Sequence, residues 1–468
     1  MLPLSFDTLR AMVQLNEPAT NRTKELPNAS SKASILRMLW VIVKPFNYLE
    51  TMHKRYGDFY LDVFSAFPPT LIISNPQAIE KVFTLSPELF LSGPANAILK
   101  PLLGATAILF QDGDRHTKKR KLLMPPFHGE RMRAYGQMIR EITLQVMAEP
   151  IKKGRFTARP VMQEISLGVI LKAVFGLREG ERYEKIRSTL IKYLDFFNVP
   201  LNATFLFFPS LQKDLGAWSP WGRFLRHQKT LYQLLDEEIQ ERREQQDFAG
   251  EDIMSLLLSA RDEEGQGISD EELRDELLAL LFAGHETTAL ALSWALYWIH
   301  YLPEVRDKLL TELSTLNIAE VDPSEIARLP YLSAVVAETL RLYPVALFTF
   351  SRVLQKPMEL MGYQIPQGVG LAIPIYMTHQ RPELYPEPKK FIPDRFLERQ
   401  FSPYEYLPFG GGNRRCIGAA FALFEMKIVL ATILTNYSLT LVDQRPVLPV
   451  RRGIVFAPAG GVRLKVKS

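Results

Sequence analysis

The chain has 468 residues, of which 47% are hydrophobic and 23% are charged. These values are ordinary for a globular protein and argue against a disordered or repetitive chain. The chain has one cysteine, so no intramolecular disulfide can form, and a reducing compartment is favoured. The formal net charge of +5 is too small to indicate a nucleic-acid partner.

The N-terminal region shows no pattern of a targeting or membrane-spanning segment. Asp7 and Arg10 interrupt it, so no secretory signal is expected. The apolar run at 35–43 contains an arginine and is far shorter than the ~20 residues that cross a bilayer. We therefore expect a cytoplasmic protein without a transmembrane anchor. Residues 1–25 should be loosely ordered, and residues 26–468 should form one domain.

In chain order, the pattern predicts a mostly helical body with small β-structures. Residues 46–56 should form a short helix, and 59–64 should pair with 70–74 as an antiparallel hairpin. Between 77 and 317 nearly every segment has a helical pattern, broken at proline or glycine. The remaining expected elements are a helix at 331–343, hairpins at 352–377, a proline-rich meander at 381–396, a last helix at 417–437 and a C-terminal hairpin at 447–466.

The longest predicted helix covers about 270–301. Ser269 is a suitable N-cap, and Glu272 completes a capping box. The helix is apolar nearly all round from 277 to 299, which is typical of a helix buried through the centre of a domain. A His-Glu-Thr-Thr segment at 285–288 lies in its middle and argues against a membrane span.

A glycine-rich loop at 409–418 carries the only cysteine and reads Phe-Gly-Gly-Gly-Asn-Arg-Arg-Cys-Ile-Gly. This loop resembles the haem-binding signature of the cytochrome P-450 superfamily. A chance match in a chain of this composition is on the order of one in ten thousand, which outweighs the alternative that the cysteine is a small core residue. The matching positions are Phe409, Gly412, Arg414, Cys416 and Gly418.

The resemblance implies that Cys416 is the axial ligand to the iron of haem b. Its place just before a helix suits a thiolate, because the helix dipole and free N–H groups stabilise negative charge. A thiolate ligand donates electron density to the iron and favours O–O cleavage. The implied fold is mainly α with small β-sheets, with the haem between the long central helix and the cysteine loop. The implied activity is that of a monooxygenase, which inserts one atom of O2 into a C–H bond of a hydrophobic substrate.

The His-Glu-Thr-Thr segment is a second motif. His285 and Glu286 begin a zinc-binding HExxH pattern, but the fifth position is Ala289, so zinc is not expected. The segment is similar to the acid–threonine pair with which the family activates oxygen. In that interpretation Glu286 relays protons, and Thr287 bonds back to a carbonyl one turn earlier and holds dioxygen or a water. Gly284 is expected to let the helix approach the haem.

A third motif combines Glu338 and Arg341, which share a helix face, with Arg395 in the meander. By itself such a pair is usually an exposed ion pair of little value. Together the three resemble the family's Glu–Arg–Arg triad, which supports the meander behind the cysteine loop.

Four basic side chains are candidates for binding the haem propionates. His116 and Arg120 are four residues apart and so lie on one helix face. The family often has tryptophan at the position of His116, so this residue departs from the family's usual pattern. Arg414 lies two residues before the cysteine, and Arg352 opens the strand where the family commonly has a propionate-binding arginine.

The substrate pocket should be apolar, with residues 196–208 as a mobile roof. The segment 112–133 resembles a cyanobacterial group associated with long-chain fatty acid hydroxylation. Some fatty-acid hydroxylases hold the carboxylate with an arginine on the early hairpin, but residues 59–74 contain no Arg or Lys. An uncharged lipid, alkane or terpene is therefore the alternative. The pocket candidates are Ile98, Leu102, Phe282, Ala283, Val345, Leu347, Phe348 and Ile454.

The resemblance further implies a monomer that takes electrons from a separate ferredoxin or flavodoxin. The basic cluster 118–121 and Arg415 are expected to form a docking surface for such an acidic partner. Two other classes of haem-thiolate protein remain as alternatives. One is a haem-thiolate isomerase or peroxygenase that needs no electron donor, against which the Glu286–Thr287 pair argues. The other is a non-catalytic haem sensor, although no effector domain is visible.

Overall fold

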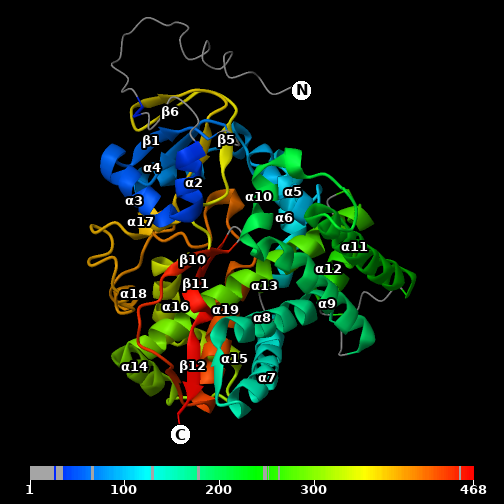
Figure 1. Cartoon of the computed structure of the whole chain (residues 1–468), viewed down its shortest axis with the longest axis vertical. Helices are drawn as coiled ribbons and strands as arrows, with labels where there is room; N and C mark the ends of the chain where they lie inside the picture. Colours follow the sequence, from blue (N-terminus) through cyan, green and yellow to red (C-terminus); the bar gives the residue numbers. More distant parts are fainter. Residues whose placement is uncertain are drawn as a thin grey trace, which may run out of the picture.

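A computed structural model describes residues 26–27, 35–64, 68–127, 131–176, 180–245, 250, 252–261, 264–452 and 455–467. Most of the described chain is helical, and small sheets lie at one side and near the C-terminus (Figure 1). The fold class is therefore as predicted, mainly α with small β-sheets. The expectations for residues 1–25 and for Ile454 lie outside the described residues.

The helices up to the central one are α2 Ile35–Val43, α3 Pro45–Tyr56, α4 Pro76–Thr84, α5 Lys100–Leu103, α6 Gly113–Leu123, α7 Arg131–Lys152, α8 Ala158–Phe175, α9 Glu181–Asp195, α10 Pro200–Phe207, α11 Pro220–Gln245, α12 Ile253–Ser259 and α13 Asp270–Tyr301. Those that follow are α14 Pro303–Leu313, α15 Pro323–Arg328, α16 Pro330–Leu342, α17 Ile375–His379, α18 Arg395–Glu398 and α19 Ala419–Asn436.

The largest sheet has the strand order β1-β2-β8-β5-β3 and joins segments far apart in the sequence. β1 and β2 form the predicted antiparallel hairpin, and β2 then pairs in parallel with β8. This sheet lies beside α2, α3 and α4 (Figure 1). Its strands are β1 Phe59–Asp62, β2 Thr70–Ile73, β3 Phe90–Leu91, β5 Arg352–Leu354 and β8 Gly370–Ala372.

The C-terminal tail differs from its prediction as one hairpin. Only β10 and β11 pair with each other, whereas β12 leaves them and lies between β4 and β9. The alternating pattern of the tail could not show this, because the partner strand β4 is about 300 residues away in the sequence. The remaining strands are β4 Arg155–Thr157, β6 Met358–Leu360, β7 Tyr363–Ile365, β9 Leu439–Leu441, β10 Pro449–Arg452, β11 Val455–Pro458 and β12 Arg463–Val466.

The central helix α13 begins at the predicted cap. The Ser269 side chain accepts a hydrogen bond from the Glu272 backbone N–H, at 3.3 Å between Oγ and N. The helix runs through the middle of the molecule against α8 and α19 (Figure 1). Both α13 and α19 are long and apolar enough to cross a membrane by composition, yet 61% and 67% of their apolar windows are buried inside the protein. Their hydrophobicity is thus explained by the core.

Candidate active site

The cysteine loop is folded by its own backbone and by close packing on α4. The Cys416 N–H donates to the Phe409 carbonyl oxygen at 3.0 Å, which closes the loop. Gly410 and Gly412 have φ values of 66° and 62°, a region that favours glycine. A Cβ at Gly411 would lie 2.2 Å from the Phe83 ring. These contacts explain why the loop is so rich in glycine.

The Cys416 side chain lies in a setting that can hold a thiolate. Protein surrounds the thiol, yet its surface is accessible, so it lies on the wall of a hollow. Burial raises the pKa of the Cys416 thiol, whereas a hydrogen bond from the Gly418 N–H and the charges of Arg120 and Arg415 lower it. A bound cation such as a metal would favour the deprotonated form further.

The four predicted propionate ligands are close enough to influence one another. Burial and the nearby charges of Arg414, Arg120 and Arg352 lower the pKa of His116 to about 4, so this side chain is neutral at physiological pH. Burial and Arg414 also lower the pKa of Arg352 to about 10. Asp112 supplies one counter-charge, with 2.6 Å between its Oδ1 and the Arg414 Nη2. The cluster therefore keeps an excess of positive charge, which suits a ligand with two carboxylates.

Arg352 also supports the cysteine loop. It is 5% exposed and donates to the carbonyl oxygens of Val82 at 3.1 Å and of Gly411 at 3.0 Å. The same guanidinium thus connects α4, β5 and the loop that precedes Cys416. The sequence could not show this structural role of Arg352, because it depends on how closely α4 packs on the cysteine loop.

The middle turn of α13 carries an exposed residue. Ala283 is exposed, although Leu281 before it and Thr288 after it are buried. The Thr287 hydroxyl donates back to the Ala283 carbonyl oxygen, one turn earlier, and this is the bond that the sequence predicted. An exposed alanine within a buried helix is the shape expected where a flat cofactor lies against the helix.

Glu286 points toward α8. The Gln163 amide donates to its carboxylate, and Arg159 Nη1 lies 3.9 Å from Glu286 Oε1. Burial raises the pKa of the Glu286 carboxyl, and these two partners oppose the rise. Sequence reasoning missed both partners, because nothing in residues 158–175 indicates which face of α8 packs on α13.

The prediction for Gly284 is wrong. A Cβ there would lie 2.9 Å from Cδ1 of Ile170, so the glycine admits α8 to close packing with α13. Its neighbour His285 is buried, and burial lowers its pKa to about 4. The helix thus uses these two positions for packing.

A second buried carboxyl lies nearby on α19. Glu425 is 1% exposed, and burial raises its pKa to about 8. The Ser166 hydroxyl lies 2.8 Å from Glu425 Oε1 and 3.2 Å from the Gly284 carbonyl oxygen. Because one hydroxyl has one proton, the arrangement is fully satisfied when a protonated Glu425 donates to Ser166 and Ser166 donates to Gly284.

The structure brings Glu338, Arg341 and Arg395 together. Arg341 Nε lies 2.6 Å from Glu338 Oε2, and Arg395 Nε lies 3.2 Å from Glu338 Oε1. The first two side chains are fully buried and Arg395 is 8% exposed. Arg341 also donates to the carbonyl oxygens of Pro388 and Lys390 in the meander.

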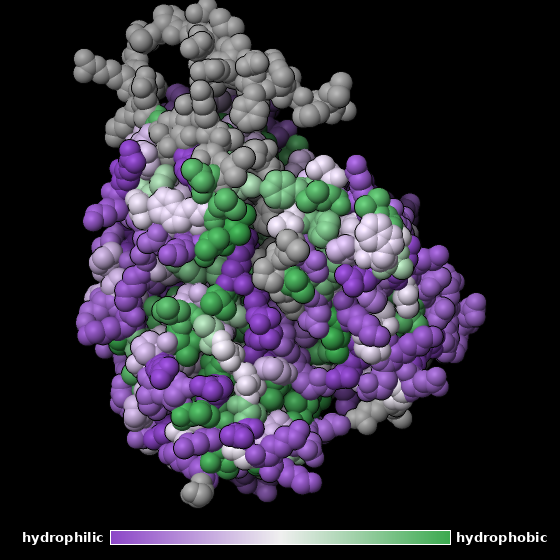
Figure 2. Space-filling model, viewed as in Figure 1, coloured by the Kyte–Doolittle hydropathy of each residue, from purple (hydrophilic) through white to green (hydrophobic). Residues whose placement is uncertain are grey.

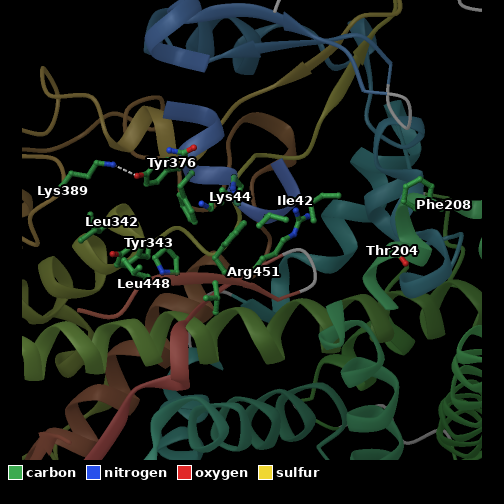
Figure 3. A pocket seen from close by; sticks show the side chains of 17 residues that line it. Ile42, Lys44, Thr204, Phe208, Leu342, Tyr343, Tyr376, Lys389, Leu448 and Arg451 are labelled. Carbon is green, nitrogen blue, oxygen red and sulfur yellow. Dashed lines mark hydrogen bonds between the residues drawn. The ribbon is translucent and has the colours of Figure 1, made fainter. Parts of the chain in front are cut away.

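The described pocket candidates other than Ala283 fall into two groups. Ile98, Phe282 and Val345 are half-buried against the main core, where Leu102 is also buried. Leu347 and Phe348 instead belong to a cluster around Tyr48 and Phe456. A cavity of about 830 Å³ has lining residues from α2, α3, α10 and β10 among others, and none of these candidates lines it (Figure 3).

The predicted basic surface needs one correction. Lys119 is only 8% exposed, and its Nζ lies 3.3 Å from Glu272 Oε1 and 3.2 Å from Glu276 Oε1 of α13. It therefore joins α6 to the central helix and is no part of a docking surface. Lys118, Lys121 and Arg415 are exposed.

Comparison with known proteins decides the family. The family model for cytochrome P450 matches residues 29–465. The chain belongs to the cytochrome P450 family. Cytochrome P450 135B1 of Mycobacterium tuberculosis is 35% identical over 446 residues, which are 95% of this chain and 92% of the relative. Cytochrome P450 138 of the same organism is 32% identical over 443 residues, 94% of this chain and 96% of the relative.

Solved structures show the same fold. Retinoic acid-bound cyanobacterial CYP120A1 has a TM-score of 0.81 with 25% identity, over 95% of this chain and 100% of that one. The heme domain of cytochrome P450DA also has a TM-score of 0.81, with 22% identity over 95% and 98% of the two chains.

This cytochrome P450 is therefore a monooxygenase with haem b as its cofactor. The residues present fit that group. The accessible thiol would bind its iron. The excess of buried positive charge would bind its carboxylates, and the exposed turn of the central helix would lie against its flat face.

Proposed function

We propose that this cytochrome P450 hydroxylates a long apolar substrate, such as a long-chain fatty acid, with Cys416 as the thiolate ligand of the haem. One observation carries the proposal. The only thiol of the chain is accessible inside the fold, and Arg120 of the basic cluster lies close enough to interact with it.

The haem, when bound, supplies the activation of dioxygen. The chain's own residues position it and manage protons. His116, Arg120, Arg352 and Arg414 would hold its carboxylates, with Asp112 keeping Arg414 in place. The Thr287 hydroxyl would donate a hydrogen bond into the hollow when it leaves the Ala283 carbonyl. Glu286 would pass protons inward from the side of α8, where Gln163 and Arg159 hold its carboxylate.

The substrate class rests on the apolar candidates Ile98, Leu102, Phe282, Ala283, Val345, Leu347 and Phe348, to which the sequence adds Ile454. The neighbour CYP120A1 was solved with retinoic acid, which is a long apolar molecule that ends in a carboxylate. We infer a substrate of the same general chemistry for this chain. A terpene or an alkane is the alternative.

Electrons would come from a separate ferredoxin or flavodoxin that docks on the face of Lys118, Lys121 and Arg415. We further propose that the protein acts as a monomer in the cytoplasm.

The test has two stages. The purified, reduced protein should bind carbon monoxide with an absorption band at about 450 nm, as a thiolate-ligated haem does. A Cys416→Ser variant should lose that band. Palmitic acid should then be hydroxylated only when dioxygen, ferredoxin and a reductant are all supplied. Absence of the band in the intact protein would overturn the proposal, and turnover without an electron donor would favour a peroxygenase or isomerase instead.

A further inference from the structure

The short C-terminal sheet carries positive charge on its outer face. This sheet has the strand order β4-β12-β9, and its strand β12 lies at the end of the molecule opposite β1 and β6 (Figure 1). Arg463, Lys465 and Lys467 are exposed and alternate with residues that are buried or half-buried. Because successive side chains of a strand point to opposite faces, these three basic residues share the face that points to solvent.

Like charges meet directly across two strands of this sheet. Lys465 lies opposite Arg155 in the antiparallel β12–β4 pair, and both side chains are exposed. Cations that face each other in this way destabilise a sheet. Arg463 is balanced by Asp443, with which it forms an ion pair. In the described part of the chain, neither Arg155, Lys465 nor Lys467 forms an ion pair, so a bound anion would relieve the repulsion.

A polar pocket of about 290 Å³ adjoins this face. The backbone N–H of Lys467 donates to the Ser438 carbonyl oxygen at 2.9 Å, and both residues line the pocket. Thr435 and Asn436, near the end of α19, add a hydroxyl and an amide, whereas three leucines and a tyrosine complete this side. The volume is close to the lower end of the range for small-molecule sites.

His300 offers an unpaired nitrogen to this pocket. Its side chain is 4% exposed, and its Nδ1 lies 2.7 Å from the Leu296 carbonyl oxygen. A carbonyl oxygen only accepts, so Nδ1 carries the proton and Nε2 is left as an acceptor. Nε2 has no hydrogen-bond partner among the described residues, yet protein does not enclose it, so it faces the pocket. Burial, together with the charges of Arg306 and Lys467, lowers the pKa of His300 to about 4, so the ring is neutral.

The pocket therefore has two ends of different chemistry. Arg306 and Asp307 both belong to its lining and pair with each other, at 2.8 Å between Nη2 and Oδ1, so they add little net charge. The unbalanced cations lie on the side of the sheet, whereas the neutral acceptor of His300 lies on the side of α13. A molecule that carries an anionic group and hydroxyl groups would satisfy both ends.

We propose that this pocket binds a small polyol phosphate. Lys465, Lys467 and Arg155 hold the phosphate, which offers several acceptor oxygens and negative charge to the unbalanced cations. The two lysines start about 7 Å apart along the strand, a spacing from which two long side chains reach one phosphate group. A hydroxyl of the polyol donates to Nε2 of His300. The site goes beyond the proposed function, because His300 lies about 20 Å along α13 from Thr287.

The surroundings of the site favour a soluble ligand over a lipid headgroup. Figure 2 shows hydrophobic side chains gathered over α2, whereas hydrophilic side chains prevail near the lower end of the molecule, where the C-terminus lies. A protein that binds lipids at a membrane surface buries apolar side chains there. A free polyol phosphate needs only the polar groups that the pocket provides.

The test is titration calorimetry on the haem-loaded full chain, with glucose 6-phosphate, glucose and inorganic phosphate as probes. The wild type should bind glucose 6-phosphate with a Kd below about 1 mM, and more tightly than either of the other probes. Lys465→Gln combined with Lys467→Gln should weaken this binding by about tenfold or more, whereas Lys465→Arg combined with Lys467→Arg should keep most of it. Without ligand, the Gln variant should have a Tm no lower than that of the wild type, because the repulsion with Arg155 is removed.

The matched control is Lys185→Gln on α9, since Lys185 is exposed and lies outside both the sheet and the pocket. It should bind glucose 6-phosphate as the wild type does. No binding by the wild type at this concentration, equal affinity for inorganic phosphate, or unchanged binding by the Gln variant would overturn the proposal. Binding to phosphatidylglycerol vesicles without binding of glucose 6-phosphate would also overturn it and point to a lipid surface. The carbon monoxide band, recorded on each variant, reports separately on the proposed function.

Discussion

At the scale of single residues, the central helix directs two adjacent side chains to different tasks. Glu286 lies against α8, where Gln163 and Arg159 hold its carboxylate. Thr287 returns its hydroxyl to the Ala283 carbonyl, at the turn where the helix is exposed. In the proposed proton relay, Glu286 would supply the proton and the Thr287 hydroxyl would take the last step.

Replacing Thr287 with alanine should uncouple electron use from product formation. Reductant consumption should continue, but product per electron pair should fall by about tenfold or more, with the missing oxidation released as peroxide. The measurement compares reductant consumed, product formed and peroxide released. Thr287→Ser keeps the hydroxyl and should stay coupled. Unchanged coupling in the alanine variant would contradict a proton role for this residue.

The sequence identified those candidate residues that belong to short motifs. The loop from Phe409 to Gly418 and the Glu286–Thr287 pair were visible because each is a short motif. Gln163 and Glu425 could not be identified from the sequence, because their roles depend on which faces of the helices pack together. The misreading of Gly284 has the same cause, since the spacing shows a small residue but not what approaches it.

At the scale of elements, α8, α13 and α19 meet around a buried acid. Glu425 on α19, Ser166 on α8 and the Gly284 carbonyl on α13 form one hydrogen-bonded chain. Burial raises the pKa of Glu425 to about 8, above the ordinary value of 4.5 that it regains on unfolding. The folded state therefore holds a proton that the unfolded state loses between these pH values.

The contribution of Glu425 to stability should thus be complete below pH 4.5 and should disappear as the pH rises through about 8. Glu425→Gln, which cannot ionise, should be more stable than the wild type at alkaline pH, by on the order of a few kcal/mol at most, and similar at acidic pH. The difference in Tm between the two proteins, measured across this range, checks the sign. A pH-independent difference would show that the pKa of Glu425 is the same in the folded and the unfolded protein.

The Glu338–Arg341–Arg395 cluster joins α16 to the meander before the cysteine loop. Glu338→Gln would leave two buried guanidinium groups without a carboxylate, at a cost of about 3–5 kcal/mol. We expect a lower Tm and loss of haem retention, measured as the carbon monoxide band per mole of protein. Glu383→Gln breaks the exposed pair with Arg381 and should cost about 0–1 kcal/mol. If both variants retained haem equally, the triad would not support the loop.

Element boundaries followed local signals where these were strong. Ser269 and Pro303 bracket α13 as expected, and the hairpin of β1 and β2 has the predicted pairing. The tail was misjudged because alternation shows a strand but not its partner. Three segments, from positions 155, 439 and 463 onward, meet in one sheet that no local pattern links.

At the scale of the whole molecule, two surfaces differ in character. The cavity of about 830 Å³ has exposed apolar residues such as Val43 and Leu448 in its lining, whereas the exposed part of α6 and the residue before Cys416 are basic. The sequence predicted a basic docking surface but included Lys119, which is buried against Glu272 and Glu276. The burial of one lysine among these four basic residues could not be seen without the position of α13.

Because Lys119 is buried, the variant that tests docking of the electron partner should leave this lysine unchanged. Lys118→Glu combined with Lys121→Glu reverses charge on the exposed face only, whereas a change at Lys119 would also disturb the contact between α6 and α13. The double variant should be reduced by ferredoxin about tenfold more slowly at low salt, and the difference should shrink as salt screens the charges. Lys229→Glu reverses an exposed charge on α11, outside this face, and is the control. Stopped-flow reduction at several ionic strengths measures the effect, and rates that do not depend on salt would exclude this face as the docking surface.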